Sequence, residues 1–213
     1  MESVLADWRP STWLVMGAMW WSMMIAMMAP SAAPTILLYA QVYRHAQAQG
    51  NAARLAPTGA FTGGYLLIWL GFSIFATVLQ WGLTKLGALA ELTMASSSAY
   101  LSAAVLLVAG LYQFSSFKDR CLTHCRAPAS FISQHWRPGA AGALRLGALH
   151  GAYCVGCCWL LMALLFIGGV MNIVWIAILA LFVLVEKLLP GGRSIGKISG
   201  LVLCLWAVAT VLV

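Results

Sequence analysis

The stretch His150-Gly151-Ala152-Tyr153-Cys154-Val155-Gly156-Cys157-Cys158-Trp159-Leu160-Leu161-Met162 lies inside a long apolar run and holds three of the six cysteines of the chain. At about 100° per residue on a helix, Cys154 falls about 40° to one side of His150 and Cys157 about 20° to the other. Cys158 lies at the edge of this face, at about 80°. We therefore expect one face of an apolar helix to present an imidazole and two or three thiols.

The composition of the whole chain places this helix in a membrane protein. Of its 213 residues, 62% are hydrophobic and 8% are charged, whereas soluble domains are about 45–50% apolar and about 25% charged. Apolar runs of roughly 20 residues without strand alternation favour helices over a β-barrel. The sequence predicts an all-α fold, a polytopic transmembrane helical bundle that forms one domain over residues 1–213 and contacts the lipid bilayer.

Six apolar runs predict about six membrane spans, at residues 13–43, 58–81, 99–117, 141–166, 171–189 and 195–213. Pro30 and Pro34 lie toward the far end of the first run and predict a kink or an early end there, because each proline removes a backbone donor. Residues 118–140 form a long polar connection. Within it, we expect a short interfacial helix at 128–136 with Phe131, Ile132 and Trp136 toward lipid.

The distribution of basic residues predicts the orientation of the bundle. Of the 12 lysines and arginines, all except Arg9 and Lys85 lie in or beside the first, third and fifth connections. The positive-inside rule places these connections in the cytoplasm and both termini outside it, in a bacterial inner membrane. The net charge of +7 comes from these connections and not from a basic helix, so no nucleic-acid partner is expected.

The cysteines of the fourth predicted span are the strongest candidates for chemistry. Thiolate and imidazole suit Cu(I) or Zn(II), and a charged thiolate in lipid is costly unless a cation compensates it. The pattern C-x2-C-C, with a histidine one turn earlier, indicates a soft-metal site at His150, Cys154, Cys157 and Cys158. The alternative interpretation is that these cysteines are small apolar packing residues.

The first predicted span carries six of the ten methionines of the chain. Met16, Met23 and Met27 share one helical face. Thioethers are soft, neutral ligands that favour Cu(I) over Zn(II), so this face is a candidate ligand set and makes a copper ion the expected cargo, ahead of zinc. The alternative is that methionine serves here as an adaptable apolar filler.

The polar connection contains a compact soft-ligand cluster at Cys121, His124 and Cys125. In the reducing cytoplasm a structural disulfide is not expected, and the flanking Arg120 and Arg126 favour the thiolate form. We expect this cluster to accept or release a metal ion. A pair of free surface cysteines is one alternative, and a thiol redox pair is another, although C-x3-C is not the usual redox spacing.

Two expectations concern how these groups are placed. Cys154 and Cys157 lie some 20 Å along the fourth predicted helix at about 1.5 Å per residue. We therefore expect them to form a site separate from the polar-connection cluster. Glu186 and Lys187 lie near the cytoplasmic end of the fifth predicted span, and we interpret them as a self-paired, snorkelling couple; a proton or ion site at Glu186 is the alternative.

Several motifs together resemble a known family. They are Ala26-Met27-Met28-Ala29-Pro30, Lys118-x2-Cys121-Leu122-x2-Cys125-Arg126-x-Pro128, Cys154-x-Gly156-Cys157-Cys158-Trp159-x2-Met162, Met171-Asn172 and Glu186-Lys187. Over most of its length the chain resembles the bacterial family described as predicted metal-binding integral membrane proteins, a domain of unknown function. One departure is Ser115-Ser116-Phe117, where that pattern has a proline. The resemblance implies metal binding and supplies no activity.

These features predict a protein that binds Cu(I) and acts in copper transport or in delivery to a membrane cuproenzyme, with a metal donor or acceptor protein as its partner. No Walker motif or nucleophile elbow is present, so neither an ATP-driven pump nor a hydrolase is supported, and no enzymatic activity is expected. A structural or assembly subunit of a larger membrane complex is the first alternative. A membrane thiol oxidoreductase is the second, but a disulfide within one helical turn would be strained.

Overall fold

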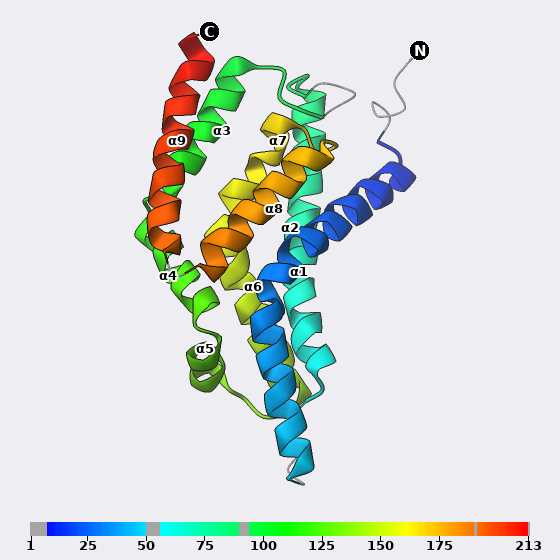
Figure 1. Ribbon diagram of the computed structural model, residues 1–213. Coiled ribbons are helices and arrows are strands. Elements are labelled where there is room, and N and C mark those ends of the chain that lie inside the picture. The colour runs from blue at the N-terminus through cyan, green and yellow to red at the C-terminus, as the bar shows by residue number, and fades with distance from the viewer. Residues whose placement is uncertain (1–7, 50–55, 90–93, 190, 213) are drawn as a thin grey trace.

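The structure, a computed structural model, describes residues 8–49, 56–89, 94–189 and 191–212, which form a bundle of helices (Figure 1). The helices are α1 (Pro10–Ala48), α2 (Thr58–Lys85), α3 (Ala99–Tyr112), α4 (Ser116–Arg126), α5 (Pro128–His135), α6 (Gly139–Ala163), α7 (Leu165–Gly168), α8 (Ile173–Leu188) and α9 (Gly192–Leu212). The predicted all-α class is confirmed. Two positions used in the predictions, Arg54 and the last residue of the sixth predicted span, lie outside the described ranges.

The number of spans differs from the prediction. Within the described ranges, α1, α2, the segment Gly139–Gly168 and α9 are long and apolar enough to cross a membrane, and α3 with α4 makes a fifth if the two count as one span bent by 65°. Helix α8 has 16 residues, which cover about 24 Å against roughly 30 Å of hydrocarbon. The prediction of about six spans is therefore not confirmed, because the apolar runs do not show where a helix bends or stops.

Helix α1 continues through both of its prolines and bends instead of ending (Figure 1). Proline removes a backbone donor and thereby loosens the helical ladder around it. Next to Pro30, the Ser31 and Tyr65 hydroxyls donate to the carbonyl oxygen of Met28, at 2.9 and 3.2 Å. These bonds tie the bend of α1 to α2 and place Met28 toward the centre of the bundle.

The position of α6 is set by a close backbone contact with α2. A Cβ at Gly64 would overlap the carbonyl oxygen of Leu144, and a Cβ at Gly147 would overlap that of Phe61. Small residues at helix interfaces allow this close approach, which maximises van der Waals contact in an apolar surrounding. The glycines thus fix the height and rotation of the cysteine-bearing helix.

Residues 118–140, predicted as a polar connection, are largely helical and fold back onto the bundle. Helix α4 lies against α6, and α5 lies beside α1 and α4. Phe131 and Ile132 are buried in a small core with Tyr39, Phe61 and Leu146. The expectation that these two side chains face lipid was therefore wrong, because the interior offers α5 an apolar surface of its own.

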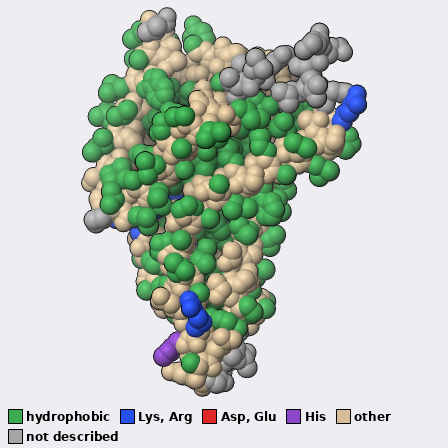
Figure 2. Space-filling model, turned by 45° about the vertical axis from the view of Figure 1, so that its right-hand side comes forward, with side chains coloured by type: hydrophobic (Ala, Val, Ile, Leu, Met, Phe, Trp, Pro, Cys, Tyr) green, Lys and Arg blue, Asp and Glu red, His purple; other side chains and the backbone are tan. Residues whose placement is uncertain are grey.

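The outside of the bundle is strongly apolar. Figure 2 shows hydrophobic side chains spread over one face, with a few lysine and arginine side chains at its margins. On α8 the exposed side chains include Ile173, Val174, Ile178 and Leu181. Soluble monomers rarely expose apolar patches of this extent.

Two adjacent glycines of α2 test the α2–α6 contact. Gly64 abuts the backbone of α6, whereas an added Cβ at Gly63 meets nothing within 4 Å. We expect Gly64→Ala to lower the unfolding temperature of the detergent-purified protein, because overpacking costs about 1–3 kcal/mol. Gly63→Ala should leave it unchanged or raise it, because alanine favours a helix by about 1 kcal/mol.

Thermal unfolding followed with a thiol-reactive dye measures this difference, since the dye reports exposure of the buried cysteines. Equal melting temperatures for the two alanine variants would show that the glycine contact does not hold α6 in place.

Candidate metal centre

The three cysteines of α6 all lie in the interior of the bundle. Cys154, Cys157 and Cys158 are buried, and the thiols of Cys157 and Cys158 donate to the carbonyl oxygen of Cys154 at 3.1 and 2.9 Å. Cys158 was expected at the edge of this face, yet it is fully buried, as is Met162 one turn later. Helix α6 contacts α2, α3, α4 and α8. Side chains at the edge of its predicted cysteine face are therefore buried as well.

Helix α4 brings a fourth thiol to these three. Cys125 packs against the buried core that contains Cys154, Cys157 and Cys158. Cys121 is buried one turn earlier on α4, and a Cβ at Gly156 would come within 2.9 Å of its sulfur. The expected separation into two sites is therefore not found. The bend between α3 and α4 folds the polar segment inward, which the sequence pattern did not indicate.

We call Cys125, Cys154, Cys157 and Cys158 the thiol cluster. Its most polar neighbour is the ammonium group of Lys187, which lies 2.9 Å from the sulfur of Cys154 and 3.2 Å from the hydroxyl of Ser31. The Lys187 side chain is only 5% exposed. A buried cation at this distance favours the thiolate form of its neighbour.

The predicted pairing of Glu186 with Lys187 was wrong. The Glu186 carboxylate lies 2.6 Å from the ammonium group of Lys118 on α4, and both side chains are buried. Successive residues of a helix point about 100° apart, so side chains at i and i+1 do not face each other. That rule was available from the sequence and points away from a self-paired couple.

Helix α1 contributes a thioether that was not singled out. The sulfur of Met28 lies 3.8 Å from that of Cys158. Of the three predicted methionines, Met27 is buried nearby, Met23 is only half-buried, and Met16 lies more than three turns away. The buried face of α1 follows Met16, Trp20, Met24 and Met28. This spacing of four residues was the signal that could have identified Met28.

The two predicted histidines have different surroundings. His150 is buried one turn before Cys154, among aromatic rings that include Tyr65 and Phe131, and its Nδ1 atom has no hydrogen-bond partner. His124 stacks on Tyr153, with ring centroids 4.4 Å apart. The structure thus brings His150 to the base of the cluster and gives His124 an aromatic partner on α6.

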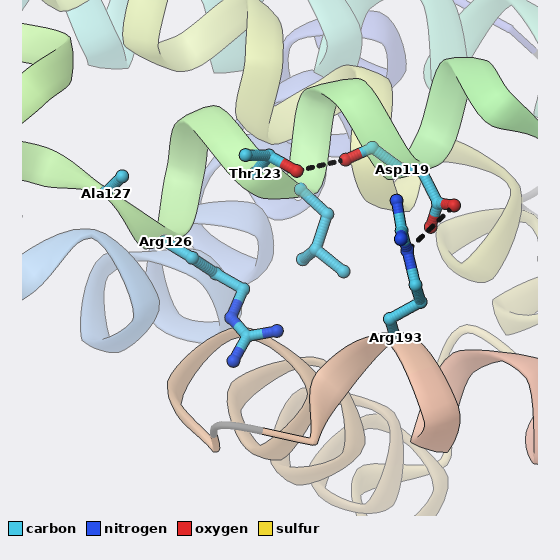
Figure 3. A pocket seen from close by; sticks show the side chains of 6 residues that line it. Asp119, Thr123, Arg126, Ala127 and Arg193 are labelled. Carbon is cyan, nitrogen blue, oxygen red and sulfur yellow. Dashed lines mark hydrogen bonds and ion pairs between the residues drawn. The ribbon is translucent and has the colours of Figure 1, made fainter.

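The outer face of α4 is polar and open (Figure 3). A surface groove there is lined by side chains that include Asp119, Thr123, Arg126 and Arg193, and Arg193 pairs with Asp119 at 3.0 Å. The cysteines of α4 point the other way, toward α6. Helix α4 therefore carries Asp119 and Arg126 on its open side, and its cysteines and the buried Lys118 on its inner side.

The arrangement is suited to a soft ion that needs few ligands. In the described part of the chain, no group of three or more His, Cys, Asp or Glu side chains is already arranged to hold a metal ion. A thiol paired with a thioether, as at Cys158 and Met28, is a different ligand set, because methionine is not one of these four residue types. Such a pair of soft sulfur donors favours Cu(I). The thiols of Cys157 and Cys158 both donate a hydrogen bond to the Cys154 carbonyl oxygen. To bind a metal ion, both side chains would have to rotate away from that oxygen.

The comparisons with known proteins agree with soft-metal chemistry. The family model for PpoB2, described as a copper chaperone, matches residues 17–210. No curated protein and no solved structure matches the chain. The matched region contains the thiol cluster, Met28 and Lys187, and it covers most of the sequence. The match supports a copper-related family, and the chain belongs to the PpoB2 copper chaperone family.

Proposed function

We propose that this protein is a membrane-embedded copper carrier that binds Cu(I) at the thiol cluster and delivers it to a membrane cuproenzyme. The observation that carries the proposal is the packing of cysteines from α4 and α6 in one buried core, beside the buried ammonium group of Lys187. Copper is the cargo of the protein and is not consumed. No reaction chemistry is needed, and we infer a carrier and not an enzyme.

Charge balance supports Cu(I) over a divalent ion. Two thiolates and one Cu(I) ion carry a net charge of about −1, which the ammonium group of Lys187 offsets in an apolar surrounding. The thioether of Met28, 3.8 Å from Cys158, adds a neutral soft donor without changing this balance. Two thiolates and a divalent ion such as zinc carry no net charge, which would leave the buried charge of Lys187 without compensation.

Delivery by ligand exchange requires a thiol that a partner can reach. Cys125 is half-buried, whereas the α6 cysteines are fully buried. A donor or acceptor protein would therefore meet the copper ion first at Cys125 and α4. The exposed apolar side chains on α8 and α9 support placement of the bundle in a membrane, where such a cuproenzyme would be reached laterally.

The two alternative functions have distinct signatures. A structural or assembly subunit would co-purify with a larger complex and contain no copper. A thiol oxidoreductase gains one supporting observation, because Cys125 and Cys154 lie on different helices and the strain of a bridge within one helical turn does not apply to them. Trapping of a Cys125–Cys154 disulfide by mild oxidant, with no copper bound under reducing conditions, would favour that function.

The thiol cluster is tested by substituting two of its members. We expect the Cys154→Ser, Cys157→Ser double variant to bind Cu(I) at least about 100-fold more weakly than the unmodified protein, since even groups behind the ligands change metal affinity by 10–100-fold. Competition with a chromogenic Cu(I) chelator, under reductant and without oxygen, measures the affinity in detergent.

Cys204→Ser is the matched control. Cys204 lies at the contact of α3 and α9, against Gly110, so its removal should leave the affinity unchanged. Copper binding that survives in the double variant, with melting temperature intact, would mean that the α6 cysteines serve packing.

The charge of Lys187 gives a second prediction. We expect Lys187→Met to weaken Cu(I) binding by about 10- to 100-fold, because a hydrogen bond to a charged group contributes about 1.5–3 kcal/mol. Lys187→Arg should retain most of the affinity, since it preserves the positive charge. Chelator competition compares the two variants, and equal affinities for Met and Arg would exclude charge compensation as the role of Lys187.

A further inference from the structure

A second group of soft donors lies at the other end of the bundle, where α1 begins and α2 ends (Figure 1). The thioether sulfurs of Met16 on α1 and Met94 before α3 both face the side-chain amide nitrogen of Gln80 on α2, at 3.8 and 2.6 Å. All three side chains are buried, and Gln80 is 0% exposed. Two sulfurs from different parts of the chain therefore meet at one buried point.

The orientation of the Gln80 amide is determined by its neighbour on α1. The indole nitrogen of Trp20 is a donor only, and it donates to the Oε1 atom of Gln80 at 2.6 Å. The amide NH2 group must then point to Met16 and Met94. Thioether sulfur is a weak acceptor, so this buried NH2 group is poorly satisfied, at a cost of the order of 1–3 kcal/mol. An apolar side chain would fill the position of Gln80 without this cost, so packing does not explain why an amide is found there.

The backbone of Met94 is also unusual. Its φ angle is +51°, and it is the one non-glycine residue with positive φ in the described ranges. Side chains other than glycine, asparagine and aspartate rarely adopt this conformation, which costs of the order of 1 kcal/mol or more. With this backbone conformation the Met94 side chain points inward, to the amide nitrogen of Gln80, and not to the surface.

This group is distinct from the thiol cluster. Met16 precedes Met28 by more than three turns of α1, roughly 18 Å along the helix. Met24 and Met27 are buried between them on the same helix. No titratable side chain takes part in the contacts among Met16, Gln80 and Met94, so the donors are neutral at every pH.

From these contacts we infer that Met16 and Met94 form a second Cu(I) site, at the end of the bundle opposite the thiol cluster. Two neutral thioethers bind a soft monovalent ion without releasing protons and discriminate against zinc. Gln80 holds both sulfurs in place while the site is empty, and the metal ion takes the sulfur lone pairs that the amide now faces. In the orientation expected from the basic residues, this end lies outside the cytoplasm, where thioethers cannot be lost to disulfide formation.

The inference shares with the proposed function only the identity of the cargo, so one experiment can separate them. Ag(I) serves as a redox-inert probe for Cu(I), and [methyl-13C]methionine labels all ten methionines of the full chain in detergent. Leucine substitutions at Met16 and Met94, which conserve volume, assign the two methyl signals. We expect Ag(I) to shift both signals in the unmodified protein and equally in the Cys154→Ser, Cys157→Ser variant.

Two comparisons complete the test. The shifts should persist at pH 5, because thioethers have no proton to lose. In the Cys154→Ser, Cys157→Ser background, the further pair Met16→Leu, Met94→Leu should lower Ag(I) binding by one ion per chain. Met19→Leu, on the same helix but only half-buried, is the control and should leave binding intact. Single leucine variants replace the double variant if its melting temperature falls.

Methyl signals of Met16 and Met94 that do not move with Ag(I) in the folded protein would overturn the inference, as would the loss of these shifts in the Cys154→Ser, Cys157→Ser variant. Loss of the thiol-cluster affinity alone bears on the proposed function and leaves this site intact.

Discussion

A buried lysine can exist in an apolar bundle only if its charge is compensated, and Lys187 places this requirement at the centre of the fold. Its ammonium group reaches Cys154 on α6 and Ser31 on α1. Its neighbour Glu186 points to the other side of α8 and pairs with Lys118 on α4, whose ammonium group also donates to Gln113. Two successive charged residues thus connect α8 to helices on both sides of it. Breaking a buried ion pair is strongly destabilising, so these contacts specify how the helices assemble.

The helical class and the cysteine face of α6 could be predicted from the sequence because both depend on local periodicity and composition. The packing of α4 against α6 could not be predicted from the sequence. A polar segment between apolar runs is typical of a solvent-exposed connection, and only the 65° bend after α3 turns the thiols of Cys121 and Cys125 inward. Whether an amphipathic helix finds a partner is a tertiary property that its own residues do not encode.

The methionines of α1 illustrate the same limit at the level of one helix. A stripe drawn through Met16, Met23 and Met27 at about 100° per residue is close to the observed buried face but rotated from it, since Met24 and Met28 are buried and Met23 is half-buried. The bend at Pro30 and the contact of Tyr65 with the Met28 carbonyl determine the rotation. An error of one residue in register was enough to miss the thioether beside Cys158.

The thiol cluster draws on parts of the chain that are made at different times. Met28 emerges early, Cys125 and the α6 cysteines follow, and Lys187 comes near the end. In zinc fingers the metal is needed for folding, whereas the contacts that hold α6 against α2 here are made by glycines and backbone atoms and not by the thiols. For the copper carrier proposed above, this order of synthesis means that the site is complete only after Lys187 has been made. The full chain would then be finished before it is loaded with copper.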